Sequence, residues 1–295
     1  MRTRHIRFEP TLLIALLVCV ACRRSHSSSA AEALEWSDPQ RVAILGYRGD
    51  AMEPFLSRDG RYLFFNNLNE PKVNTNLHWA QRLDDLTFQY KGELQCVNTA
   101  WLEGVPSMDR DGNFYFVSNR SYDQTASTLY RGHFSAGNIS SVELIPGVSV
   151  SRPGIVNFDA EISADGNTLY FVESQFSRTG QPKTAVILFA RKKGSTFVRD
   201  DASNAMLRSV NGFGLDYAPA TSPSELEIFF TRADQNGPVI YTARRTSLMS
   251  PFGEEMRIRV IDGFAEAPTL SPDGKSLYYH RRDGDHFVLY RVSRK

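Results

Sequence analysis

Residues 267–279 read Ala-Pro-Thr-Leu-Ser-Pro-Asp-Gly-Lys-Ser-Leu-Tyr-Tyr, with a tight-turn signal between two short apolar segments. In Ser-Pro-Asp-Gly the serine and aspartate side chains can cap the turn, and the glycine can adopt a positive φ. The aromatic-rich segment that follows is typical of a strand that is covered on both faces. This stretch therefore predicts a strand, a tight turn and a second, buried strand.

The same unit occurs five times along the chain. The copies occupy residues 53–65, 105–116, 159–171, 218–230 and 267–279. Aligned on the aspartate of Asp-Gly, they are spaced by 52, 54, 59 and 49 residues. The fourth copy is degenerate, because Ser224 and Glu225 stand where the others have Asp-Gly. A repeat of this length must be interpreted before any single element.

Two further strands are expected after each turn unit. The third strands are predicted over residues 77–81, 128–132, 186–191, 239–243 and 287–292. Weaker fourth strands are predicted in the first four copies, over residues 92–97, 139–145, 205–210 and 256–261. Four antiparallel strands repeating at about 50 residues are typical of a propeller blade.

The fifth copy has no fourth strand of its own, and an unmatched strand at residues 41–46 precedes the first copy. Pairing of this strand beside residues 287–292 would close the ring and remove a sheet edge. The sequence thus predicts an all-β protein, a five-bladed β-propeller of four-stranded antiparallel blades over residues 36–295, with no second domain.

The N-terminal residues have the pattern of an export signal. Arg2, Arg4 and Arg7 precede an apolar run of 11 residues, 11–21, which is shorter than the roughly 20 residues of a membrane-spanning helix. The run ends in Val-Cys-Val-Ala-Cys and resembles a bacterial lipobox, with Cys22 as the lipidated residue. We expect a signal peptide over residues 1–21, a flexible tether over 22–35, and export to the bacterial envelope, on the periplasmic face of the outer membrane or the cell surface. Cleavage near Ala30 or a retained anchor are the alternatives.

Composition excludes several classes of protein. The chain has 34 Lys and Arg against 33 Asp and Glu, so it lacks the basic excess that holds a nucleic-acid backbone. Three cysteines cannot build a disulfide scaffold. Cys96 alternates with Leu94 and is predicted to be a buried free thiol.

The repeats resemble the WD40-like β-propeller repeats of TolB-type periplasmic proteins, and the likeness covers nearly all of the chain after residue 35. It implies the fold, but folds host many activities. The chain departs from TolB itself, because it has five copies where TolB has six and no room for TolB's additional α/β domain. A role in the Tol system is therefore not implied.

Acidic residues recur close to the start of every inner strand, where the channel of a propeller opens. The candidate ligand-binding residues are Glu53, Trp101, Glu103, Asp159, Glu161, Asp216, Tyr217 and Glu266, with Arg120 and Arg232 from neighbouring loops. One interpretation is a ring of carboxylates that binds sugar hydroxyls, amines or a cation. The other is that each carboxylate accepts backbone N–H bonds within the fold. The aromatic residues, with Phe158 and Phe264, could stack on a ligand ring or pack between blades.

No catalytic constellation stands out. The sequence has no Gly-x-Ser-x-Gly and no His-Glu-x-x-His motif, and we predict no cofactor, metal site or catalytic residue. The favoured function is a monomeric, non-catalytic protein that binds an envelope protein or glycan through one face and does not bind nucleic acid. A glycoside hydrolase using two channel-mouth carboxylates is the alternative, and a scaffold without a ligand is the third.

Overall fold

A computed structural model describes residues 36–69, 73–152, 154–177, 180, 182–212, 214–234 and 237–295. The expected signal peptide (1–21), the tether (22–35) and the lipidation residue Cys22 lie outside the described residues. Within them, no helix is both long and apolar enough to cross a membrane.

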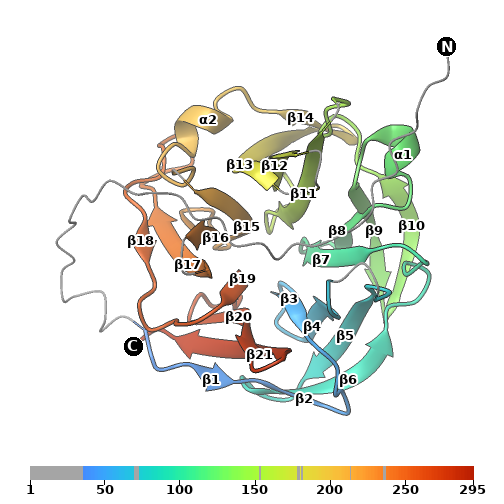
Figure 1. Cartoon of the computed structure of the whole chain (residues 1–295), viewed down its shortest axis with the longest axis vertical. Coiled ribbons are helices and arrows are strands. Elements are labelled where there is room, and N and C mark those ends of the chain that lie inside the picture. The colour runs from blue at the N-terminus through green and yellow to red at the C-terminus, as the bar shows by residue number, and fades with distance from the viewer. Residues whose placement is uncertain are drawn as a thin grey trace.

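The described chain is almost entirely β-structure, arranged as groups of strands around a central axis (Figure 1). Each group runs from an inner strand to an outer one. The first contains β3 (Met52–Leu56), β4 (Tyr62–Asn66), β5 (Leu77–Arg82) and β6 (Thr87–Glu93). The second contains β7 (Glu103–Met108), β8 (Asn113–Ser118), β9 (Leu129–Ser135) and β10 (Asn138–Leu144). The third contains β11 (Ile155–Ile162), β12 (Thr168–Phe176), β13 (Pro182–Lys193) and β14 (Thr196–Arg199).

The remaining strands continue the same order. The fourth group contains β15 (Leu215–Thr221), β16 (Glu227–Asp234), β17 (Gly237–Arg244) and the short β18 (Met256–Arg257). The fifth contains β19 (Ala265–Leu270), β20 (Ser276–Asp283), β21 (His286–Ser293) and β1 (Gln40–Arg41). The third and fourth groups are joined into one sheet by the parallel pair Ala185 and Leu215. The all-β propeller class predicted from the repeats is confirmed.

The ring is closed by the N-terminal segment, although not as a single strand. Gln40 and Arg41 pair with β21, and the Val42 N–H donates to the Leu289 carbonyl at 2.9 Å. The chain then crosses over, and β2 (Ala43–Leu45) pairs in parallel with β6 of the first group. The prediction that all of residues 41–46 lie beside β21 is therefore wrong in its second half. The segment instead links the last group to the first, as its position between β21 and β6 in Figure 1 shows.

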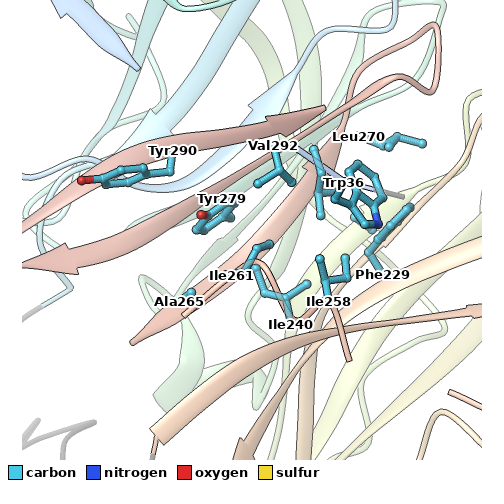
Figure 2. Close-up of a cluster of buried hydrophobic side chains, with 12 residues drawn as sticks. Trp36, Phe229, Ile240, Ile258, Ile261, Ala265, Leu270, Tyr279, Tyr290 and Val292 are labelled. Carbon is cyan, nitrogen blue, oxygen red and sulfur yellow. The ribbon is translucent and has the colours of Figure 1, made fainter. Parts of the chain in front are cut away.

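A buried tryptophan fixes the beginning of this closing segment (Figure 2). Trp36 is 3% exposed and packs edge-on against Phe229 of β16, with ring centroids 6.1 Å apart. It belongs to a cluster with Leu277, Tyr279 and Val292, and so lies between the fourth and fifth groups. Burial of such a large apolar side chain stabilises the contact between the groups.

The outer strands differ most from the sequence prediction. Residues 205–210, predicted as a strand, belong instead to helix α2 (Ser203–Met206) and the turn after it, and the outer strand is β14. In the first group the outer strand begins five residues earlier than predicted, and β18 has only two residues. A second short helix, α1 (Tyr122–Thr125), lies between β8 and β9.

Cys96 also differs from the prediction, since it is an exposed free cysteine. β6 ends at Glu93, and the φ of 64° at Cys96 turns the chain three residues later, so the strand alternation expected from Leu94 to Cys96 does not persist. The buried-thiol prediction is wrong because the strand ends before this residue.

Candidate functional site

The five inner strands surround a narrow axial cavity of about 30 Å³, which is far below the roughly 300–1,000 Å³ of small-molecule sites. β3, β7, β11, β15 and β19 each contribute to its wall. Four of them place a proline in it: Pro54, Pro106, Pro219 and Pro268. The channel is therefore nearly filled, and any ligand would meet it at one end.

Each inner strand carries an irregularity at the same repeat position, directly before that proline or, in β11, before Ala160. The register of pairing with the second strand shifts there in all five copies. The residues at the shift have positive φ: Glu53, Val105, Asp159, Ala218 and Ala267, with values from 48° to 54°. Because the feature recurs in every copy, it belongs to the repeat and does not by itself mark a site.

Side chains satisfy the backbone N–H groups that these bulges remove from the sheet ladder. The Ala218 N–H donates to Asp159 Oδ2 at 2.8 Å, and the Ala267 N–H donates to Thr231 Oγ1 at 3.0 Å. The Val105 N–H has two acceptors, Glu53 Oε2 at 3.2 Å and Asn66 Oδ1 at 3.1 Å. Because Asn66 also accepts this N–H, the Val105 N–H would keep a hydrogen-bond acceptor without the Glu53 carboxylate.

Replacing Thr231 with valine should destabilise the protein by about 1–3 kcal/mol, because the buried Ala267 N–H would lose its acceptor while the side-chain volume is kept. Urea unfolding measures the change. The matched control is Thr246→Val, which removes an exposed hydroxyl and should change stability by less than about 0.5 kcal/mol. Equal effects of the two substitutions would contradict the capping role.

Three of the candidate carboxylates come together at the end of the channel where the inner strands begin. Glu53, Asp159 and Glu266 interact electrostatically with one another, and Tyr217 interacts with all three. The Tyr217 hydroxyl donates to Glu266 Oε1. We call Glu53, Asp159 and Glu266 the axial carboxylates.

A histidine and an asparagine hold this group in place. The Glu53 N–H donates to His280 Nδ1 at 3.1 Å, so the ring hydrogen of His280 is on Nε2, which donates to Glu266 Oε2 at 3.0 Å. Asn69 Nδ2 donates to Glu53 Oε1 at 2.8 Å. Sequence reasoning missed both residues. The signal for His280 is its register position opposite Glu266 in the second strand of the fifth copy.

The environment makes two of the axial carboxylates weak acids. Burial, together with the charges of Asp159 and Glu266, raises the pKa of Glu53 from 4.5 to about 8. Burial and the charge of Glu266 raise the pKa of Asp159 from 3.8 to about 7, although its bond from the Ala218 N–H acts in the opposite direction. Near neutral pH, therefore, the group holds protons that ordinary carboxyl groups would have lost.

The other acidic candidates are used within the fold. Glu103 is fully buried and accepts hydrogen bonds from Thr99 and Ser118, and its carboxylate lies 3.0 Å from the Arg120 guanidinium. Asp216 pairs with Arg232 at 2.6 Å and accepts the Gly212 N–H. Burial raises the pKa of Asp216 against the opposing effect of Arg232. Arg120 and Arg232 are thus partners of these carboxylates.

Glu161 lies toward the opposite end of the channel from the axial carboxylates. Its partner is Arg58, which comes from the turn between β3 and β4, and the two side chains are 3.0 Å apart and both buried. The expected ring at one mouth is therefore divided into two sets, because the bulge turns Glu161 away from Asp159, two residues before it.

The aromatic candidates also separate. Trp101 is 53% exposed on the loop before β7. The Tyr217 hydroxyl donates to Glu266. Phe158 packs against Phe176 with ring centroids 6.3 Å apart, and Phe264 packs against Phe287 with ring centroids 5.7 Å apart. Within the described residues, no group of three or more His, Cys, Asp or Glu side chains is arranged to hold a metal ion.

Comparisons with known proteins bear on the fold. The chain matches no protein-family model and no curated protein. A solved structure described as a glycoside hydrolase is similar with a TM-score of 0.63 and 10% identity, over 91% of this chain and 96% of that one. Zg3597, a family 117 glycoside hydrolase from Zobellia galactanivorans, gives a TM-score of 0.55 and 10% identity, over 89% and 91%. TolB from Acinetobacter baumannii gives a TM-score of 0.49 and 16% identity, over 85% of this chain and 55% of the TolB chain. At such low identity the likenesses to the two glycoside hydrolases show the β-propeller fold alone.

Proposed function

We propose that this protein is a non-catalytic binding protein that captures an envelope protein or glycan at the end of the channel where the axial carboxylates lie. One observation carries the proposal. Among the described residues, Glu53, Asp159 and Glu266 have no arginine or lysine ion-pair partner, whereas Glu103, Glu161 and Asp216 each have one. A buried cluster of three carboxyl groups that has no arginine or lysine partner in the described fold, and in which the pKa values of Glu53 and Asp159 are raised, is typical of a functional site.

The size of the cavity supports binding of a single group. A space of about 30 Å³ admits one ammonium or hydroxyl group and not a sugar ring. Carboxylates accept hydrogen bonds from both kinds of donor. The partner would insert one such group between the axial carboxylates and cover the surrounding surface, on which Trp101 offers an exposed aromatic face.

The cellular setting is part of the same proposal. The basic start, the short apolar run and Cys22 support export and a lipid anchor on the bacterial envelope. The repeat sequences support membership of the TolB-type WD40-like propellers. A monomer that approaches the membrane only through its anchor, and does not bind nucleic acid, fits this setting.

Capture of a partner from envelope extract by the full chain tests the proposal. The variant Glu53→Gln, Asp159→Asn, Glu266→Gln should lose at least tenfold in affinity, because the Glu266 carboxylate is removed and the other two side chains can no longer ionise when a partner inserts an ammonium group. The matched control is Glu254→Gln, Asp262→Asn, Asp285→Asn, which removes three exposed carboxylates and should bind normally. Equal capture by the two variants would exclude the axial carboxylates as the binding site. Circular dichroism confirms that both are folded.

A second candidate function is glycoside hydrolysis with the sugar ring lying outside the narrow cavity, at its mouth, and the raised pKa of Glu53 favours it. A glycosidase needs a carboxyl group protonated near neutral pH beside an ionised one. Incubation of the chain with envelope glycans distinguishes the two candidates. Binding without release of reducing ends supports the binding protein, whereas release that Glu53→Gln abolishes would establish the enzyme.

A further inference from the structure

A larger recess lies at the other end of the inner strands, between the turns of the fourth and fifth copies. Its volume is about 440 Å³, which is in the range of small-molecule sites, about 300–1,000 Å³. The turns contribute to its walls Ser222, Pro223, Ser224 and Leu226 from the fourth copy, and Leu270, Pro272, Asp273 and Gly274 from the fifth. Four side chains from the adjacent strands and C-terminal residues complete it: Glu227, Arg244, Arg245 and Arg294.

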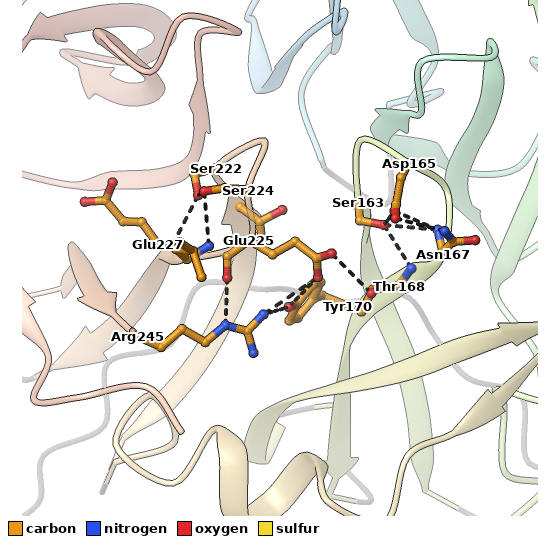
Figure 3. A network of polar contacts seen from close by, with 12 residues as sticks. Ser163, Asp165, Asn167, Thr168, Tyr170, Ser222, Ser224, Glu225, Glu227 and Arg245 are labelled. Atoms are coloured by element: carbon orange, nitrogen blue, oxygen red, sulfur yellow. Dashed lines mark hydrogen bonds and ion pairs between the residues drawn. The ribbon is translucent and has the colours of Figure 1, made fainter. Parts of the chain in front are cut away.

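The turn of the fourth copy lacks a carboxylate that the other four turns possess. In the third copy, Ser163 Oγ donates to Asp165 Oδ1 at 2.6 Å, and the same oxygen accepts the Asn167 N–H at 3.0 Å. In the fourth, Ser222 Oγ meets the Ser224 hydroxyl at 3.2 Å in place of a carboxylate, and the Leu226 N–H donates to Ser224 Oγ at 3.4 Å. Figure 3 shows the two turns side by side. The shorter Ser224 removes negative charge and side-chain volume from the wall of the recess.

The residue at the glycine position of this turn does not restore the charge. Glu225 has a φ of 54°, and its carboxylate bonds Thr168 and the Tyr170 hydroxyl of the third group (Figure 3). It is not among the residues that line the recess. The carboxylate of Glu227 is already shared by Arg244 and Arg294.

Two of the lining arginines have donors without acceptors. The side chain of Arg245 is fully buried, its Nε donates to the Glu225 carbonyl at 2.7 Å, and its Nη2 lies 3.9 Å from the Glu225 carboxylate. Its Nη1, however, has no hydrogen-bond partner. Arg294 Nε is likewise buried without a partner. A buried guanidinium N–H without an acceptor is costly, so an acceptor from outside the fold would stabilise this region.

We propose that the recess binds a small ligand through one oxyanion, a carboxylate or a phosphate, which occupies the place that the aspartate carboxylate has in the other four turns. Arginine is suited to this role, because its planar fork matches both groups. The site is independent of the axial carboxylates, since it is formed by other residues at the other end of the strands.

Restoring the missing aspartate provides the test. Calorimetric titration of the full chain with inorganic phosphate, and separately with acetate, should show saturable binding to the native protein. Ser224→Asp should weaken that binding at least tenfold, because its carboxylate fills the site. Ser224→Asn has nearly the same shape without the charge and should bind within threefold of the native affinity. The two titrations show which oxyanion is preferred.

Two results would overturn the proposal: no saturable binding of either anion at constant ionic strength, or equal affinity of the Asp and Asn variants. Ser224→Asp should remain folded, because aspartate is the residue of the other copies. A second variant, Arg244→Gln, removes a half-exposed guanidinium and should weaken binding severalfold. Unchanged affinity in that variant would likewise count against the site.

Discussion

Replacing Arg58 with alanine is expected to destabilise the protein by about 3–5 kcal/mol, because a buried ion pair would lose one partner. Arg58 lies in the turn after β3, but its guanidinium extends to two other groups of strands. Its Nε donates to the Met108 carbonyl at 3.1 Å, and its Nη2 lies 3.0 Å from Glu161 Oε1. The two side chains are 8% and 6% exposed. Without the arginine, the Glu161 carboxylate would remain buried with hydroxyl and amide donors only.

Arg61 supplies the matched control for this prediction, since it belongs to the same turn. Its pair with Asp59 has side chains that are 69% and 44% exposed, so Arg61→Ala should lower the stability far less than Arg58→Ala does. Urea unfolding of the two variants at neutral pH gives the comparison. A loss below 1 kcal/mol for Arg58→Ala would mean that Glu161 does not depend on this partner.

The inner half of each repeat could be predicted because local and tertiary signals agree there. The Ser-x-Asp-Gly turns and the aromatic strands after them form in register, and the third strands extend the predicted ranges by a few residues. The outer strands other than β6 pair with one neighbouring strand only, so their sequences are less constrained. Residues 203–206 form a helix, although a strand was expected over residues 205–210. The outer strand of that group is β14, and the hairpin glycine Gly194 before it is the sequence signal for it.

For the candidate site, the sequence predicts which kinds of residue are present but not how their side chains are arranged. The sequence places acidic residues near the start of every inner strand, but a bulge in each strand decides which way each one points. Glu53 and Asp159 are themselves the positive-φ residues of their bulges, and Glu266 is one residue before the bulge residue of its own strand. Glu103 and Asp216 are each two residues before theirs. A shift of one residue turns a side chain to the other face of a strand. Sequence spacing alone therefore could not separate the axial carboxylates from those paired with arginine.

The substitution Glu53→Gln should make the protein more stable at alkaline pH and leave it nearly unchanged at pH 5. The folded state holds the Glu53 proton up to a pKa of about 8, whereas the ordinary value is 4.5. At pH values between these two pKa values, the unfolded chain binds fewer protons than the folded one. The stability that this group contributes therefore falls as the pH rises. Glutamine resembles the protonated carboxyl group and carries no such dependence. The advantage of the variant should reach on the order of 3 kcal/mol at pH 9.

Urea unfolding at intervals from pH 5 to 9 measures the difference between the native protein and Glu53→Gln. The control is Glu103→Gln, which removes the carboxylate partner of Arg120 in a fully buried site and should be less stable than the native protein throughout this range. A Glu53→Gln advantage that does not grow with pH would show that the pKa of Glu53 is not raised in the folded protein. Growth with pH, together with loss of partner capture, would connect the proton that Glu53 retains to the surface that binds the partner.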